Sequence, residues 1–382
     1  MKIERDNMKR RDFLKKALLT SGLLSTGLMS ASPASGQQRK EATSEKEYRI
    51  DSYCHFSIMS VIDFLEKASK SYPHIFKSLF ANTPALINIE KRLALMDECG
   101  IDLSILVPLP WLETTPTVHA DSKLCAEAAR LFNDELAMIV NKRPDRFIGV
   151  ALLPTTDPEV MLEEFERAVR KLKLVGGFFV VGPTVKPPDH PHYEILYKKA
   201  VELNAPLWIH PSRPPEYPDY VGEKISQYQV WQTLNWLLDS STAMVRLVFS
   251  GVYERHPDLK LIIHHHGALI PLFAKRMQYG WDYFEQNTGK KQPTTISRPY
   301  IDHFKKFYCD TATQGHEPLI LKMAYDFFGQ DHLLFGSDAP MDPTGGKAFT
   351  LDAKKSVEDM GLSKADRQKI FSQNILRLLK RG

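Results

Sequence analysis

The chain has 382 residues, of which 43% are hydrophobic and 25% are charged, a globular composition that excludes a collagen, a disordered tail and a small disulfide scaffold. Its formal charge of +4 arises in the first 36 residues, which carry seven basic and three acidic side chains. The remaining residues carry 43 basic and 43 acidic side chains. They offer no basic field that would attract nucleic acid, so no nucleic-acid partner is expected.

The N-terminal segment resembles a twin-arginine export signal. The pair Arg10-Arg11 precedes a mildly apolar run over residues 17–29, which small residues follow. This run is too short to span a membrane, which takes about 20 residues. We therefore predict a signal peptide over residues 1–36, cleaved after Gly36 with Ala31 as the alternative site, and a periplasmic protein exported by the twin-arginine route. The alternative is an amphipathic helix of the mature fold.

From residue 48 to residue 380, short apolar runs alternate with longer amphipathic ones, and no low-complexity linker divides them. This pattern indicates one α/β domain without a membrane span. The apolar runs predict strands over 49–55, 102–107, 147–153, 175–181, 206–210, 259–264, 307–310 and 332–335. The amphipathic runs predict helices over 87–98, 122–140, 158–172, 193–203, 233–255, 269–286, 317–328 and 363–380. Eight such units favour a (β/α)8 barrel of the TIM type, with an open doubly wound sheet as the alternative.

The four cysteines have no Cys-x-x-Cys spacing; they are Cys54, Cys99, Cys125 and Cys309. A chain that folds in the cytoplasm before export keeps its thiols reduced while the core forms. We interpret these side chains as buried small apolar residues, with a disulfide framework as the alternative.

Side chains that can bind a metal stand at the ends of the predicted strands. They are His55, His210, His264, His265, His266, Asp310 and Asp338. A single histidine after a strand is ordinarily structural. In a barrel, however, the carboxyl ends of all strands open on one face, so neutral imidazoles and carboxylates from several strands can converge on one divalent cation.

Five sequence strings, taken in order, resemble the amidohydrolase-related family, in the branch that includes aminocarboxymuconate-semialdehyde decarboxylase and γ-resorcylate decarboxylase. The strings are EKRLALMDECGID (90–102), RPDRFIG (143–149), IHP (209–211), HPDLK (256–260) running into HHG (265–267), and LFGSDAP (334–340). The resemblance covers about residues 48–379. It implies a metal-dependent (β/α)8 barrel of the hydrolase type with a divalent cation, Zn²⁺ or Mn²⁺.

Carried over residue by residue, the resemblance implies that His210 and Asp338 are metal ligands. His55 keeps the place of a ligand on the first strand, where the family carries His-x-His or Glu-x-His. This chain has Tyr53 in the first of those two positions, on the same strand face as His55. Three alternatives follow: three protein ligands with waters, coordination by Tyr53 as a phenolate, or a degenerate site. We favour a hydrogen bond from Tyr53 to a metal-bound water over direct coordination, because a neutral phenol must lose its proton to coordinate well.

The resemblance also implies that His265 is the catalytic histidine of the His-x-Gly segment. His264 and His266 would then lie on the opposite pleat of the strand, where packing or hydrogen bonding is expected. Arg213, three residues after His210, is a candidate to bind an anionic group of the substrate. A surface salt bridge is the alternative role for Arg213.

These residues predict an enzyme, a metal-dependent non-oxidative decarboxylase of a small aromatic or unsaturated carboxylic acid. His265 and Asp338 are the candidates for proton transfer. One alternative is metal-dependent hydrolysis of a lactone, ester or amide, which uses the same ligands. Another is a periplasmic binding protein on a degenerate enzyme scaffold. The expected partner is a small-molecule substrate, and a homodimer is possible because the family often forms dimers.

Overall fold

The computed structural model describes residues 47–69, 75–290, 296–297 and 299–379. The chain divides into two units, at Tyr48/Arg49, and the architecture below is that of the second unit, Arg49–Gly382. The predicted signal peptide, residues 1–36, lies outside the described residues.

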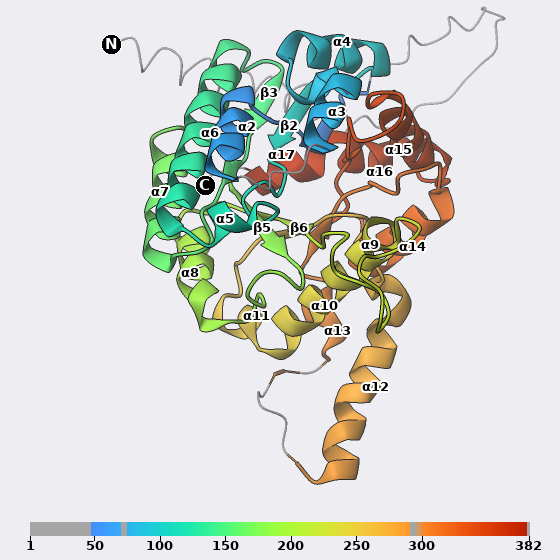
Figure 1. The fold of residues 1–382 in the computed structure, drawn as a ribbon. Helices are drawn as coiled ribbons and strands as arrows, with labels where there is room; N and C mark the ends of the chain where they lie inside the picture. The colour runs from blue at the N-terminus through green and yellow to red at the C-terminus, as the bar shows by residue number, and fades with distance from the viewer. Residues whose placement is uncertain (1–46, 70–74, 291–295, 298, 380–382) are drawn as a thin grey trace, which may run out of the picture. The chain divides into compact units, whose positions relative to one another are not determined.

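Parallel strands form the core of this unit, and helices surround them (Figure 1). The strands are β1 (Ile50–His55), β2 (Leu103–Val107), β3 (Phe147–Gly149), β4 (Ala151–Leu152), β5 (Gly177–Val181), β6 (Leu207–Pro211), β7 (Leu261–Ile263) and β8 (Tyr308–Cys309). Strands β1 to β3 pair in one sheet and β4 to β8 in another. Only Val150 separates β3 from β4, and its amide donates to the carbonyl of Leu106 at 3.0 Å. Together β3 and β4 therefore fill one strand position.

Residues 333–335 fill the eighth strand position and close the ring. The amide of Leu334 donates to the carbonyl of Cys309 in β8, at 2.8 Å. On the other side, the amide of Ser52 in β1 donates to the carbonyl of Phe335, also at 2.8 Å. The first and last strands therefore lie side by side, and the predicted (β/α)8 barrel is confirmed.

The helices largely follow the predicted pattern. Their bounds are α2 (Met59–Ala68), α3 (Ile75–Asn82), η1 (Pro84–Leu86), α4 (Ile89–Cys99), α5 (Pro116–His119), α6 (Ser122–Lys142), α7 (Pro158–Arg170), η2 (Pro191–Tyr193), α8 (Glu194–Glu202), α9 (Val230–Thr233), α10 (Asn235–Phe249), α11 (Val252–Arg255), α12 (Ile270–Thr288), α13 (Ile301–Phe304), α14 (Pro318–Phe328), α15 (Lys347–Asp359), α16 (Lys364–Gln368), η3 (Lys369–Gln373) and α17 (Asn374–Leu379). The helix predicted over 233–255 is interrupted at Gly251, whose φ of 76° is left-handed. Helices α2, α3, α5, α13 and α15 lie wholly outside the predicted ranges.

Short polar side chains start three of the long helices. Asn88 before α4, Asp121 before α6 and Asp157 before α7 each accept hydrogen bonds from two backbone amides of the first turn. Such N-caps satisfy amides that have no partner inside the helix, and each contributes about 1 kcal/mol to stability. These caps set where the helices begin on the outside of the barrel. All four cysteines are free and buried.

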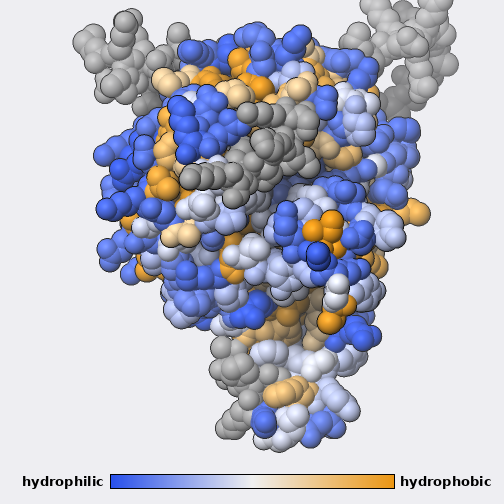
Figure 2. Space-filling view, in the orientation of Figure 1, coloured by the Kyte–Doolittle hydropathy of each residue, from blue (hydrophilic) through white to orange (hydrophobic). Residues whose placement is uncertain are grey.

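Helix α12 extends away from the barrel in Figure 1 and exposes several large apolar side chains. They are Leu272, Phe273, Tyr279, Tyr283 and Phe284. Figure 2 shows hydrophobic residues among hydrophilic ones in this region. Among the helices that the structure describes, α12 included, none is both long enough and apolar enough to cross a membrane.

Candidate metal centre

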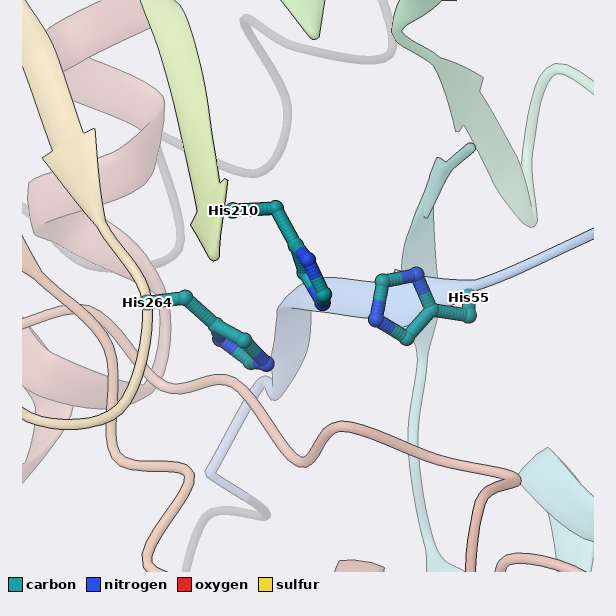
Figure 3. Close-up of side chains that lie close together, drawn as sticks. All are labelled: His55, His210 and His264. Atoms are coloured by element: carbon teal, nitrogen blue, oxygen red, sulfur yellow. The ribbon is translucent and has the colours of Figure 1, made fainter. Parts of the chain in front are cut away.

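Three histidines from separate strand positions point toward one another at the carboxyl ends of the strands (Figure 3). His55 is the last residue of β1, His210 lies near the end of β6, and His264 directly follows β7. All three are buried, at 2% exposure or less. One possible ligand atom from each lies within 4.8 Å of those from the other two, a separation that one metal ion can bridge.

The outer nitrogen of each ring is held by an oxygen. Nδ1 of His55 donates to the carbonyl of Pro108 at 3.0 Å, and Nδ1 of His210 donates to the carbonyl of the next residue. Nδ1 of His264 donates to the carboxylate of Asp310. Because a carbonyl oxygen can only accept, the proton of a neutral ring sits on Nδ1. The inner Nε2 atoms then carry lone pairs, which is the arrangement of metal-ligating histidines.

The Asp338 carboxylate follows the eighth strand and faces this cluster. Its Oδ1 lies 3.2 Å from Nε2 of His55 and 3.2 Å from Nε2 of His264. Its Oδ2 accepts a hydrogen bond of 2.7 Å from the amide of Gln314 and lies 3.6 Å from Nε2 of His265. One carboxylate thus contacts imidazoles from β1 and from the segment after β7.

These donors fit a divalent cation. Nε2 of His264 has no hydrogen-bond partner among the described residues, although it is buried against Asp338. Burial alone would lower the pKa of His264, but the carboxylates of Asp310 and Asp338 outweigh it and raise that pKa to about 9. Burial likewise opposes ionisation of Asp338, yet His264 and the other imidazoles hold the pKa of Asp338 well below its usual range. The two carboxylates thus favour positive charge among these donors, and a divalent cation is one source of such charge.

A turn in the backbone separates His264 from its two neighbours. Strand β7 ends at Ile263, and His265 and His266 have left-handed φ values of 59° and 49°. The alternation of faces along a strand therefore does not apply here, and the expectation that His264 lies on the opposite pleat is wrong. His264 forms a hydrogen bond as expected, but it does so within the cluster. Burial and the neighbouring His264 lower the pKa of His265.

Tyr53 lies beside the cluster but does not offer its oxygen to it. Its hydroxyl donates to the backbone carbonyl of Ile209 at 3.3 Å, and its ring stacks on His264 with the centroids 3.8 Å apart. Burial and the charge of Asp310 raise the pKa of Tyr53 well above its usual value, which opposes the phenolate. In this arrangement the Tyr53 hydroxyl is directed at a backbone carbonyl, and coordination of a metal by Tyr53 stays a prediction.

The loop around Asp338 is fixed against β1. The amide of Asp338 donates to the carbonyl of Tyr53 at 3.0 Å. Asp51 accepts a hydrogen bond of 3.0 Å from the amide of Ser337, and these two residues are 286 positions apart. A side chain on Gly336 would place its Cβ 2.9 Å from the Cβ atoms of Tyr53 and Asp310, so only glycine fits at this crossing. The chain thereby holds Asp338 over the end of β1.

Arg213 does not point a free guanidinium at the cluster. Its Nε and Nη2 donate to the two carboxylate oxygens of Asp239 at 2.9 and 2.8 Å, and its guanidinium lies 4.7 Å from the centre of the Tyr217 ring. A bidentate pair of this kind uses the fork that would bind a substrate carboxylate. The structure thus favours the salt-bridge alternative for Arg213 over substrate binding.

Three side chains at the site were not assigned a role from the sequence. Asp310 was named among the candidate metal-binding side chains but given no specific role, and its contact with His264 gives it one. Gln314 holds Asp338, and the indole of Trp236 lies 5.4 Å from the ring of His210 and 6.4 Å from that of His265. No motif marks either residue. Gln314 lies in the loop between β8 and α14, and Trp236 lies at the start of α10, so only the fold brings them to the site.

A (β/α)8 barrel with a buried His/Asp cluster at its strand ends defines a protein of the metal-dependent barrel class. Residues 50–381 match the amidohydrolase family, and the chain belongs to this family. The resemblance seen in the sequence motifs, to the branch of γ-resorcylate decarboxylase, is confirmed by the relatives.

Several decarboxylases are similar to this chain. It is 31% identical over 303 residues to γ-resorcylate decarboxylase from a Rhizobium species, a match that covers 76% of this chain and 86% of the relative. The crystal structure of 2,6-dihydroxybenzoate decarboxylase from Rhizobium has a TM-score of 0.70 at 27% identity, and the match covers 87% of this chain and 99% of that one. A dihydroxybenzoic acid decarboxylase from a Polaromonas species, solved with bound manganese and 2-nitroresorcinol, has a TM-score of 0.70 at 28% identity, covering 87% and 97%.

Proposed function

We propose that this protein is a metal-dependent non-oxidative decarboxylase of a small aromatic or unsaturated carboxylic acid. The observation that carries the proposal is the convergence of inward-facing imidazole nitrogens on the buried Asp338 carboxylate. The similarity to decarboxylases over most of both chains supports the reaction class. His55, His210 and Asp338 would hold the cation, Zn²⁺ or Mn²⁺, and manganese is bound in the Polaromonas relative.

The reaction requires charge stabilisation and one proton. A bound divalent cation supplies Lewis-acid stabilisation of negative charge on the substrate oxygens. The bond between the substrate carbon and its carboxylate breaks, CO₂ leaves, and the electron pair stays on that carbon. A proton then forms the new C–H bond, so a proton donor must stand beside the reacting carbon.

Asp338 and His265 are the side chains placed to move that proton. Nε2 of His265 lies 3.6 Å from Oδ2 of Asp338, and the Gln314 amide holds this oxygen in place at 2.7 Å. These two side chains are therefore the candidates to deliver the proton once substrate is bound. The indole of Trp236 lies beside the rings of His210 and His265 and forms part of the wall of the site.

A substrate screen tests the reaction class. Protein loaded with Zn²⁺ or Mn²⁺ is incubated with hydroxybenzoates and with small lactones, while CO₂ release and acid release are followed separately. We expect CO₂ release from one of the carboxylic acids, lost with a chelator and restored by the metal. Acid release from a lactone without CO₂ from any acid would instead establish the hydrolase. Absence of both bound metal and metal-stimulated turnover would favour the binding protein.

We also propose that the protein is exported by the twin-arginine route to the periplasm. The support is the sequence of residues 1–36 alone. A fusion of residues 1–40 to a folded reporter is expected to reach the periplasm, and replacement of Arg10 and Arg11 by lysine is expected to abolish this export. Undiminished twin-arginine export of the lysine variant would refute the proposal.

A homodimer that uses α12 is the third part of the proposal. Tyr279 and Tyr283 lie one helical turn apart on this helix and are 70% and 66% exposed. Large exposed side chains of this kind on one helix face are typical of a protein–protein contact. We expect sedimentation of the mature protein to give a dimer, and the double variant Tyr279→Lys and Tyr283→Lys to give a monomer. A wild-type monomer at micromolar concentration would contradict this.

A further inference from the structure

His264 occupies a position that the sequence motifs leave without a role. It follows β7 directly and is fully buried. Its Nε2 has no hydrogen-bond partner among the described residues and lies 3.2 Å from Oδ1 of Asp338. Nε2 of His55 lies at the same distance from the same oxygen. The Nε2 atoms of His264 and His55 thus lie equally far from Oδ1 of Asp338.

The ring of His264 is fixed in this orientation from two sides. Its Nδ1 donates to Oδ2 of Asp310, whose other oxygen accepts the amide of Ala312 at 3.0 Å. The ring of Tyr53 covers one face of His264, with an angle of 13° between the two planes. A carboxylate on the outer nitrogen is the usual support of a metal-ligating histidine, because it fixes the tautomer and aims the inner lone pair.

The two neighbouring histidines lack this support. Nδ1 of His265 and Nδ1 of His266 both have no hydrogen-bond partner among the residues that the structure describes. His265 faces the other oxygen of Asp338, at 3.6 Å. Of the three consecutive histidines, only His264 combines an anchored outer nitrogen with an unpartnered inner one.

From this geometry we propose that His264 supplies a third imidazole ligand to the metal, and that Asp310 is the residue that positions it. The metal would then be held by His55, His210, His264 and Asp338. Tyr53 contributes its ring to the packing of His264 and not its oxygen to the metal. This inference rests on the proposed function only in requiring a divalent cation at the site.

Two roles are tested in the mature protein, that of His264 as a ligand and that of Asp310 as the residue that positions it. The measurement is the affinity for Zn²⁺, determined by competition with a chelating dye. His264→Asn keeps an amide that can donate to Asp310 but removes the imidazole, and we expect it to weaken Zn²⁺ binding by more than about 100-fold. Asp310→Asn is expected to weaken binding by about 10- to 100-fold, the usual effect of losing a group that orients a ligand. The control, His266→Asn, removes the adjacent imidazole and is expected to stay within about threefold of the wild type. The melting temperature of each metal-free variant shows whether its fold is intact.

X-ray absorption of the zinc-loaded wild type provides a second measurement that needs no variant. Three imidazoles around zinc would support the inference, and two would overturn it. Wild-type Zn²⁺ affinity in His264→Asn, or equal losses in His264→Asn and His266→Asn, would also overturn it. A wild type that holds zinc with three imidazoles but releases no CO₂ would refute only the proposed reaction. CO₂ release with unchanged zinc affinity in His264→Asn would refute only the ligand role.

Discussion

Replacement of Asp338 by asparagine is expected to lower the rate of CO₂ release by at least about 10³-fold without unfolding the protein. Asparagine tolerates the left-handed φ of 64° at this position, and its amide oxygen can still accept the hydrogen bond from Gln314. It lacks the negative charge that faces His55 and His264, and it cannot carry the proton. Initial rates at saturating substrate, with elemental analysis of bound metal, measure the effect.

Asp342 provides the matched control for this experiment. It is also a buried aspartate, four residues further along, but its carboxylate accepts the amides of Thr344 and Phe349 and does not contact the cluster. Asp342→Asn keeps an acceptor and is expected to retain turnover within a few-fold of the wild type. Comparable losses in both variants would show that the effect of Asp338→Asn comes from disturbance of the loop rather than from the site.

His265→Asn is expected to lower kcat by about 10²- to 10⁴-fold while the metal content stays at the wild-type level. His265 faces Oδ2 of Asp338 at 3.6 Å, and its Nδ1 has no partner in the described part of the chain that would fix the ring as a ligand. Asparagine again tolerates the left-handed φ of 59°. Metal content and kcat are measured on the same preparation, so that loss of metal and loss of proton transfer are separated.

Two further variants serve as references for His265→Asn. His210→Ala is expected to lose bound metal, because one ligand is removed from the cluster, and His266→Asn is expected to keep both metal and turnover. If His265→Asn loses metal as His210→Ala does, then His265 is a ligand and the assignment of the proton carrier is wrong. The pair therefore distinguishes a ligand from a catalytic residue by two independent readouts.

Much of the barrel could be predicted because its strands are short, apolar and bounded by polar residues. The pattern located His55, His210 and Asp338 at strand ends, and the structure brings them together. Helices α2 and α15 were missed although their buried residues recur at helical spacing, at 61, 62 and 65 in α2 and at 350, 353, 356 and 357 in α15, a signal that the sequence offered. Gly251 interrupts a periodic run that would otherwise indicate a single helix.

The role of His264 could not be derived from strand periodicity. That rule holds only while the backbone stays extended, and here the strand ends one residue earlier, at Ile263. The left-handed conformations of His265 and His266 then redirect the following side chains. Gln314, which donates a hydrogen bond to Asp338, is itself in a left-handed conformation, with φ of 57°. At this site the unusual backbone conformations determine which side chains meet.

The contact between Asp51 and Ser337 joins the first strand of the barrel to the last, so the barrel can close only late in synthesis. β1 is made early, and the edge that it offers to residues 333–335 has no backbone partner until the ribosome has released almost the whole chain. His55 lies on that early strand, whereas Asp338 follows its late partner. A nascent chain that stops before residue 333 therefore leaves one edge of β1 unpaired and lacks the carboxylate of Asp338.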